Sequence, residues 1–387
     1  MGHFVAVRMR VAFVSESVSQ HRETGATRRI RRTAEGLARR GHDVVVCCAQ
    51  WWEGDHEAFE QDGVTYRAVT DEPPGESGRF AVSLPTALRA VDPDVIQTTA
   101  AVPGHVLAAK VASLFLRAPL IVDWYESPNA GDADDPRWRL AATVPDLVLA
   151  PSETVRTRVR ELGADGDAVR VVPNGIDVDA VREADPRAVA DVVYSRRLDR
   201  DANLESLLLA LAELRDHDWS ALVIGDGPER DVYERQVRDL RIDDRVSFAG
   251  EQPLENRLAA FKGAHVYAQT ARREPFPTDM LRALACGCAG VVEYHVESSA
   301  HELVEQEERA FRTTSEQELT DALVAAAEME TMEFNGNFAE YDEDAVLETY
   351  LDAYRDAEAR MSWVEPAAVA GGVLVVVALV ALLVVLL

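Results

Sequence analysis

Two short segments combine residue types that could bind a phosphate group. Arg196 and Arg197 follow an apolar run, and adjacent guanidinium groups at a strand end suit a diphosphate better than a core. The segment Ile-Gly-Asp-Gly-Pro, with Gly225 and Gly227, follows another apolar run and opens a helix, so its amides could face an anion. A strand-to-helix turn would use the same glycines, and the sequence leaves both interpretations open.

Two further loops carry candidate residues. Gly25 lies between the first expected strand and helix, where a missing side chain lets the backbone approach a phosphate, although a simple turn is the commoner explanation. Glu274, in Glu-Pro-Phe-Pro, precedes a helix whose first turn could present free N–H groups. These two loops are further candidates for contact with an anion.

A basic segment follows Gly25. We expect its arginines on the solvent side of a helix whose apolar face is Ile30, Ala34 and Leu37. These arginines are Arg28, Arg29, Arg31 and Arg32. A solvated surface is the simpler interpretation; the alternative is contact with anionic lipid head groups or with the phosphate of a lipid acceptor.

Strands and helices alternate along most of the chain. The expected strands are residues 11–14, 44–48, 95–97, 120–122, 147–150 and 169–172, then 192–194, 221–224, 246–249, 266–268 and 289–293. Two such blocks predict two doubly wound α/β domains, 9–172 and 173–338, with a ligand cleft between them at the carboxyl ends of the strands. Residues 339–362 predict an acidic helix.

The composition narrows the function class. The 387 residues include 40 Lys+Arg and 67 Asp+Glu, and the net charge of −27 argues against nucleic-acid binding. Only Lys110 and Lys262 are lysines, which favours adaptation to concentrated salt over the alternative of a GC-rich genome. The 4 cysteines are too few for a disulfide scaffold, and their spacing is not that of a zinc site.

The last 22 residues, 366–387, carry no charge. A helix of this length would span ~33 Å, enough for a hydrocarbon core of ~30 Å. We therefore predict a transmembrane helix at 364–387 that acts as a single-pass anchor in the cell membrane. Arg355 and Arg360 precede it, which favours cytoplasmic main domains.

Seven segments between Arg10 and Ser299 stand in an order that resembles one family. They are RVAFVSE, DLVLAPSETVRTRV, VRVVPNGIDV, RRLDRDANLESLLLAL, LVIGDGP, DDRVSFAG and REPFPTDMLRALACGC. They resemble the retaining glycosyltransferases of group 1 (family 4), which have the GT-B fold; with the salt-adapted composition they suggest a halophilic archaeon as the source. The resemblance implies transfer of a sugar from a nucleotide-diphosphate donor with retention, no metal and no cofactor.

The resemblance also assigns roles to residues. Arg197 matches the arginine that holds the donor diphosphate, and Glu274 matches a glutamate near the donor sugar, so these two are the candidate catalytic residues. The candidate donor-binding residues are Gly25, Gly225, Gly227, Phe248, Gly250, Pro277, Thr278 and Arg282. Candidate acceptor or lipid contacts are the four arginines of the basic segment with Tyr125 and Glu126.

Three positions depart from the family pattern. Ala202 stands where a lysine usually meets the diphosphate, Arg282 where a second glutamate usually accepts bonds from the ribose, and Tyr125 where a histidine is common. Arginine has no acceptor atom, so Arg282 cannot do the same task as a glutamate.

Two hypotheses follow. The first is an enzyme with a rebuilt site that transfers a sugar to a membrane-associated or lipid-linked glycan acceptor, with Arg196, Arg200 or Arg282 supplying the charge lost with the lysine. The second is a catalytically degenerate GT-B protein that serves as a membrane-tethered scaffold or regulator. In this fold the last helix commonly crosses back to the amino-terminal domain, and we expect the same of 339–362.

Overall fold

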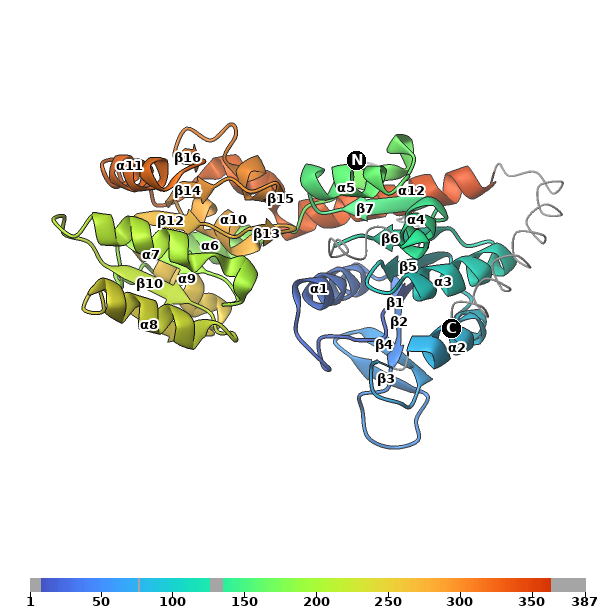
Figure 1. Cartoon of the computed structure of the whole chain (residues 1–387). Helices are drawn as coiled ribbons and strands as arrows, with labels where there is room; N and C mark the ends of the chain where they lie inside the picture. Colours follow the sequence, from blue (N-terminus) through green and yellow to red (C-terminus); the bar gives the residue numbers. More distant parts are fainter. Residues whose placement is uncertain (1–7, 76, 126–134, 363–387) are drawn as a thin grey trace. The chain divides into compact units, whose positions relative to one another are not determined.

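The computed structural model describes residues 8–75, 77–125 and 135–362 and divides the chain into two units (Figure 1). Unit 1 comprises residues 1–151, 155–172 and 347–387, and unit 2 comprises residues 152–154 and 173–346. The carboxy-terminal part of the chain therefore returns to the amino-terminal unit.

Unit 1 is built on an eight-stranded sheet in the order β3-β4-β2-β1-β5-β6-β7-β8. The strands are β1 (Arg10–Val14), β2 (Asp43–Ala49), β3 (Ala58–Gln61), β4 (Val64–Thr70), β5 (Val95–Thr99), β6 (Leu120–Asp123), β7 (Leu147–Ala150) and β8 (Val169–Val171). All neighbours pair in parallel except β3 and β4. The central strands are short apolar runs because helices cover both faces of the sheet.

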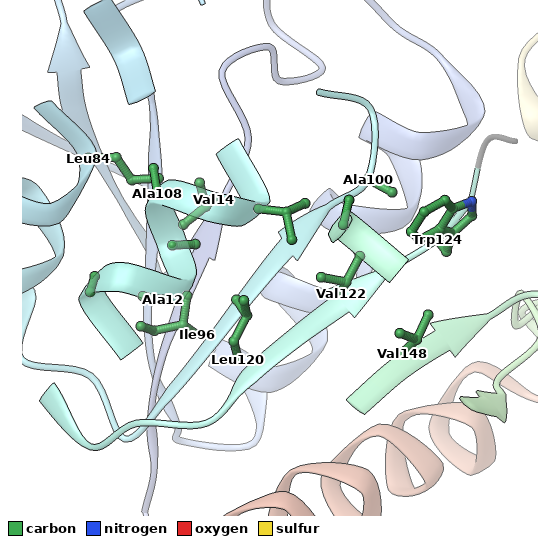
Figure 2. Close-up of a cluster of buried hydrophobic side chains, with 14 of the residues drawn as sticks. Ala12, Val14, Leu84, Ile96, Ala100, Ala108, Leu120, Val122, Trp124 and Val148 are labelled. Carbon is green, nitrogen blue, oxygen red and sulfur yellow. The ribbon is translucent and has the colours of Figure 1, made fainter. Parts of the chain in front are cut away.

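Two groups of helices cover that sheet. They are α1 (Gly25–Arg39), α2 (Ser77–Val91), α3 (Pro103–Leu116), α4 (Pro136–Thr143), α5 (Glu153–Glu161) and α12 (Glu343–Ser362), with a 3₁₀ turn η1 (Gly166–Ala168). Leu84 of α2 and Ala108 of α3 pack with Ile96 and Val122 of the sheet in one core (Figure 2). The helix α1 lies on the other face and contacts α12.

Unit 2 has a six-stranded parallel sheet in the order β11-β10-β9-β12-β14-β16, and a small parallel pair of β13 and β15. Its strands are β9 (Val192–Ser195), β10 (Ala221–Ile224), β11 (Val246–Gly250), β12 (Val266–Gln269), β13 (Arg273–Glu274), β14 (Ala289–Glu293), β15 (Glu297–Ser298) and β16 (Ala310–Thr313). Its helices are α6 (Val178–Glu183), α7 (Leu204–Glu213), α8 (Arg230–Leu240), α9 (Leu254–Gly263), α10 (Thr278–Ala285) and α11 (Glu316–Ala327). Short 3₁₀ turns are η2 (Arg200–Ala202), η3 (Ser299–Leu303) and η4 (Gly336–Tyr341).

The expected alternation is present, and the differences have physical reasons. The strands expected at 147–150, 221–224 and 289–293 have those bounds. The sequence-based prediction lacked β3, β4 and β16. The residues of β3 are exposed at the edge of the sheet, and β4 and β16 are only partly buried, so none of the three is a continuous apolar run. The acidic helix begins at Glu343 rather than 339, because residues 336–341 form η4.

The predicted membrane-spanning segment, 364–387, lies outside the described residues. Within the described ranges, no helix has both the length and the apolar character needed to cross a membrane.

One of the arginines expected at the surface of α1 is in the core, which corrects the sequence-based prediction. Arg29 is only 5% exposed, and its Nε donates to both carboxylate oxygens of Asp123 at 3.0 and 2.9 Å. Its Nη2 donates to the carbonyl of Val172 at 2.7 Å. Burial alone would lower the pKa of Arg29, but Asp123 outweighs this and raises it. Arg29 is buried because α1 has a second covered face, which meets α12.

The helix α12 completes this polar core. The hydroxyl of Tyr350 donates to Asp123 Oδ2 at 3.2 Å, and the hydroxyl of Tyr354 donates to Gln97 Oε1. A Cβ on Gly36 of α1 would lie 3.0 Å from Leu347 Cδ2, so the glycine allows the two helices to pack closely. The buried ion pair therefore joins α1, β6 and α12.

We expect Arg29→Met to destabilise the protein by about 3–5 kcal/mol, because the substitution leaves the carboxylate of Asp123 buried without its cation. Arg28→Met, at an exposed position one residue away, should change stability by less than about 0.5 kcal/mol. Urea unfolding followed by circular dichroism measures both. Equal midpoints for the two variants would show that the ion pair does not hold unit 1 together.

Candidate functional site

The strand order of unit 2 creates a topological switch point between β9 and β12. The chain runs from β9 outward to β10 and β11, then returns to the other side of β9 at β12. Ligands of open α/β sheets bind at such a point, outside the carboxyl ends of the strands. The loops that follow β9 and β12 carry Arg196, Arg197 and Glu274.

Arg196 and Glu274 form an ion pair at this point, with side chains that are 14% and 17% exposed. Arg196 Nη1 lies 3.4 Å from Glu274 Oε2 and donates to the carbonyl of Arg273 at 3.0 Å. Burial raises the pKa of Glu274, although the neighbouring guanidinium opposes the shift. The charge of Arg196 is thus engaged inside the protein, and the pair links the two loops that border the switch point.

Arg197 has the opposite orientation. Its side chain is exposed, whereas the next residue, Leu198, is fully buried. Within the described ranges, Arg197 has neither a hydrogen-bond partner nor an ion-pair partner for its side chain. Its assignment to a donor diphosphate stays a prediction, but its guanidinium is available for an anionic ligand.

Gly225 and Gly227 lie where their loop closely approaches the loop that carries Arg196 to Leu198. A Cβ on Gly225 would lie 2.0 Å from the carbonyl oxygen of Arg196, and one on Gly227 would lie 2.2 Å from that of Leu198. Gly225 also has a φ of +125°. Their N–H groups already donate to the carbonyl of Gly250 at 2.8 Å and to Asp226 Oδ1 at 2.7 Å. The loop that carries Arg197 is held by other backbone bonds, from Arg196 N to the carbonyl of Ile224 at 3.0 Å and from Leu198 N to that of Asp226 at 2.9 Å. Both glycine amides have acceptors within the protein, and their contact with an anion stays a prediction.

A second, largely buried charge cluster surrounds Asp279 on α10. Arg282 Nη1 donates to Asp279 Oδ1 at 2.7 Å, and Arg257 Nη1 of α9 donates to both carboxylate oxygens at 2.7 and 2.6 Å. Ser195 Oγ, at the end of β9, donates to Oδ2 at 2.7 Å. Although burial alone would raise it, Arg282 and Arg257 lower the pKa of Asp279 to about 2.

Asp279, Arg257 and Ser195 were not among the residues predicted from the sequence. Asp279 and Arg282 are three residues apart on one helix, a spacing that predicts an ion pair and could have shown that Arg282 has a partner on its own helix. No local pattern indicates that Arg257 reaches the same carboxylate from α9. The prediction that Arg282 contacts the donor is untested, and its charge is paired inside unit 2.

The remaining predicted donor contacts of unit 2 lie near these loops. Thr278 Oγ1, at the start of α10, accepts from Asn174 Nδ2 at 2.8 Å, and Pro277 precedes this helix without a side-chain cap. Phe248 is half-buried against the core, and Gly250 at the end of β11 has a φ of +70°. Their contacts with a nucleotide stay predictions.

In unit 1, Gly25 begins α1 beside Tyr125. A Cβ on Gly25 would lie 2.6 Å from Tyr125 Cε1, so the ring requires a glycine here. Tyr125 is itself 8% exposed, and Arg29 lies over its ring at 5.9 Å. Glu126 lies outside the described residues. The close packing gives Gly25 a structural reason that is independent of any phosphate.

The other arginines of the basic segment differ from one another. Arg28 is exposed, Arg31 pairs with Glu23 at 3.2 Å, and Arg32 is half-buried. The prediction that Arg29 contacts a lipid or an acceptor is wrong, because its side chain is in the core.

In the part of the chain that the structure describes, no group of three or more His, Cys, Asp or Glu side chains could hold a metal ion.

The two units match two families of sugar-transferring enzymes. Residues 24–180 match the family described as Glycosyltransferase Family 4, and residues 182–345 match the Glycosyl transferases group 1.

Curated relatives are glycosyltransferases of low identity. The 2-deoxystreptamine glucosyltransferase of Streptomyces kanamyceticus is 26% identical over 166 residues, 39% of this chain and 43% of the relative. The GDP-mannose-dependent alpha-(1-6)-phosphatidylinositol monomannoside mannosyltransferase of Mycolicibacterium smegmatis is 27% identical over 289 residues, 64% of this chain and 71% of the relative. The match to the Streptomyces enzyme thus spans about two fifths of that relative's length.

Solved structures resemble the chain over most of its length. Sucrose-phosphate synthase from Thermosynechococcus elongatus has a TM-score of 0.70 at 18% identity, covering 91% of this chain and 100% of that one. HepE of Anabaena, in complex with UDP-glucose, has a TM-score of 0.65 at 18% identity, covering 92% and 98%.

Two α/β units with parallel sheets, similar to these structures, define a fold of the GT-B class. The matches of residues 24–180 and 182–345 to their families then place the chain among the group 1 glycosyltransferases.

We expect Gly225→Ala to destabilise unit 2 by roughly 1–3 kcal/mol through backbone strain alone, with the contact to Arg196 adding to this. Gly104→Ala is the matched control, because a Cβ there meets nothing within 4 Å and the residue lies in the first turn of α3. Thermal unfolding measures both variants. A Gly225 variant as stable as the Gly104 variant would contradict the close approach.

The depressed pKa of Asp279 has a consequence for acid stability. A carboxylate with a pKa of about 2 in the folded protein and about 3.9 in the unfolded chain stabilises the fold above pH 4, and this stabilisation is lost as the pH falls toward 2. We expect the free-energy gap between wild type and Asp279→Asn to shrink by roughly 2 kcal/mol between pH 6 and pH 2. Urea unfolding at both values measures it.

Asp239→Asn provides the control, because Asp239 is exposed. The difference in free energy of unfolding between Asp239→Asn and wild type should be the same at both pH values. A gap for Asp279→Asn that is likewise constant would mean that the buried cluster does not hold the carboxylate in its charged form.

Proposed function

We propose that the protein transfers a sugar from a nucleoside-diphosphate sugar to a hydroxyl group of an acceptor, with retention of configuration at the anomeric carbon. The single observation that carries the proposal is the exposed Arg197, which has no ion-pair partner among the described residues, beside the largely buried Arg196–Glu274 pair at the switch point of unit 2. The matches to the group 1 family supply the reaction class.

The chemistry follows from the charges at this site. As the bond between the sugar and the diphosphate breaks, negative charge develops on the leaving phosphate, and Arg197 would stabilise it at that stage. Arg196 would not share this role, because Glu274 engages its guanidinium. The Glu274 carboxylate would accept hydrogen bonds from hydroxyls of the donor sugar and so orient it. No metal or cofactor has a part in this proposal.

The proposed acceptor is membrane-associated or lipid-linked. Its support is the uncharged segment at 366–387, which would tether the chain to the cell membrane with both units in the cytoplasm. The relative from Mycolicibacterium smegmatis is named for a phosphatidylinositol monomannoside, which is consistent with such an acceptor. The halophilic source suggested by the composition stays a prediction.

The alternative is a scaffold protein of the same fold that no longer transfers a sugar. Two observations favour it: Ala202 is fully buried at the position where the family has a lysine, and Arg282 pairs with Asp279. Donor binding discriminates between the two hypotheses, because only the enzyme requires it.

We expect Arg197→Ala to weaken binding of nucleoside diphosphates by roughly 10- to 150-fold, since a hydrogen bond to a charged group contributes about 1.5–3 kcal/mol. Calorimetry with UDP, GDP, ADP and dTDP, on the full chain, measures this and identifies the base. Arg235→Ala, an exposed arginine of α8, should bind like wild type.

Folded wild-type protein that binds none of the four diphosphates would favour the scaffold. Saturable binding that Arg197→Ala leaves unchanged would keep the enzyme hypothesis and remove Arg197 from the donor site.

A further inference from the structure

One of the seven segments that resemble the family, DLVLAPSETVRTRV, has no role in the proposed function so far. Its residues 152–154 belong to unit 2, although the residues before and after them belong to unit 1. Ser152 immediately precedes α5 and is only 1% exposed. Its hydroxyl connects this short segment with the loop that carries Glu274, the predicted contact of the donor sugar.

The carbonyl oxygen of Pro275, the residue after Glu274, accepts hydrogen bonds from two serine hydroxyls. Ser152 Oγ donates to it at 2.9 Å, and Ser299 Oγ donates to it at 2.8 Å. Ser299 is also 1% exposed, and its hydroxyl lies 3.1 Å from the carbonyl oxygen of Glu274. Because a carbonyl oxygen has two lone pairs, the two serines together satisfy Pro275.

These carbonyl contacts matter because the chain beyond Glu274 has few backbone donors. Pro275 and Pro277 have no N–H group, so this part of the loop is anchored through its carbonyl oxygens. Before Glu274, Arg196 Nη1 donates to the carbonyl of Arg273 at 3.0 Å. The backbone is thus held on both sides of Glu274 by side chains from other segments. Since a misplacement of about 1 Å can abolish a productive contact, these anchors determine what the Glu274 carboxylate can reach.

Glu302, in η3, fixes the backbone next to Ser152. Its carboxylate accepts from the backbone N–H of Glu153 at 2.9 Å and from that of Thr154 at 2.7 Å. It also accepts from the hydroxyl of Thr154 at 2.6 Å. The first N–H groups of a helix have no acceptor within the helix, and a carboxylate is a favourable partner for them. Because Glu302 and Ser299 belong to the same 3₁₀ turn, η3 holds both the start of α5 and the loop of the donor site.

We propose that Ser152 is a positioning residue of the donor site, which acts with Glu302 to hold Glu274 where its carboxylate accepts from the hydroxyls of the donor sugar. The inference rests on the proposed function, in which Glu274 orients the sugar and Arg197 stabilises the diphosphate. Ser152 does not itself bind the donor, because its hydroxyl proton is donated to Pro275. Affinity for the sugar, but not for the diphosphate, therefore depends on residues that do not touch the ligand.

Calorimetry on the full chain separates the two parts of the donor. UDP, GDP, ADP and dTDP are titrated first, followed by UDP-glucose, GDP-mannose, ADP-glucose and dTDP-glucose. For each base, the dissociation constant of the diphosphate divided by that of the nucleotide sugar measures what the sugar contributes, and we call it the sugar ratio. We expect Ser152→Ala to lower the sugar ratio by roughly 2- to 12-fold, as for the loss of one hydrogen bond between neutral groups. The affinity for the diphosphate alone should change by less than about twofold.

Ser113→Ala is the matched control, because Ser113 of α3 is also buried but belongs to unit 1, and its sugar ratio should equal that of wild type. Glu302→Ala should lower the sugar ratio as Ser152→Ala does. Glu302→Gln should keep it near the wild-type value, because the amide oxygen can still accept from Thr154. In a Glu274→Ala background, Ser152→Ala should have no further effect, since a positioning residue acts only through the side chain that it positions.

Equal sugar ratios for Ser152→Ala and Ser113→Ala, in variants that circular dichroism shows to be folded, would overturn the inference and leave Ser152 a purely structural residue. An effect of Ser152→Ala that persists undiminished in the Glu274→Ala background would also overturn it, because the serine would then not act through Glu274. Wild-type protein that binds neither the diphosphates nor the nucleotide sugars contradicts the proposed function as well. A failure of the proposed function and a failure of the positioning role alone therefore give different results.

Discussion

The buried pair of Arg29 and Asp123 is the interaction on which the organisation of unit 1 depends. Removing both charges from water costs several kcal/mol, and the geometry offsets this with three hydrogen bonds from one guanidinium. The partners come from the first helix, the sixth strand and the last residue of unit 1 before the boundary with unit 2, Val172. Tyr350 adds the last helix to the same carboxylate. Unit 1 is therefore incomplete until the carboxy-terminal part of the chain has been synthesised, and its folding requires contacts between residues that are very far apart in sequence.

In unit 2, the backbone rather than the side chains determines how the predicted site is presented. The loop with Arg196 and Arg197 is pressed against the loop with Gly225 and Gly227 so closely that no side chain fits between them. This contact turns Leu198 into the core and leaves Arg197 in solvent. Two adjacent arginines with identical chemistry thereby acquire different tasks: one holds Glu274 in place, and the other faces outward.

The sequence predicted the features that depend on local pattern and missed those that depend on distant partners. Short apolar runs gave the central strands, because each is buried on both faces. The apolar positions of α1 predicted one buried face through Ile30, Ala34 and Leu37. The second buried face, with Arg29 and Gly36, exists only because α12 returns to cover it. In the same way, the spacing of Asp279 and Arg282 could predict their ion pair, but only the fold brings Arg257 of α9 and Ser195 of β9 to the same carboxylate.

The cluster at α10 changes what that helix offers to a ligand. In the family pattern a glutamate at position 282 accepts hydrogen bonds from ribose hydroxyls. Here the carboxylate on this helix is Asp279, and its two oxygens already accept from Ser195, Arg282 and, twice, Arg257. A carboxylate has about four acceptor positions, so Asp279 has none left for a hydroxyl donor, whereas a guanidinium has five donors. A ligand group beside Arg282 must therefore accept hydrogen bonds, as a phosphate or carbonyl oxygen does. The hydrogen-bonding character of position 282 is therefore the reverse of that of the glutamate in the family pattern.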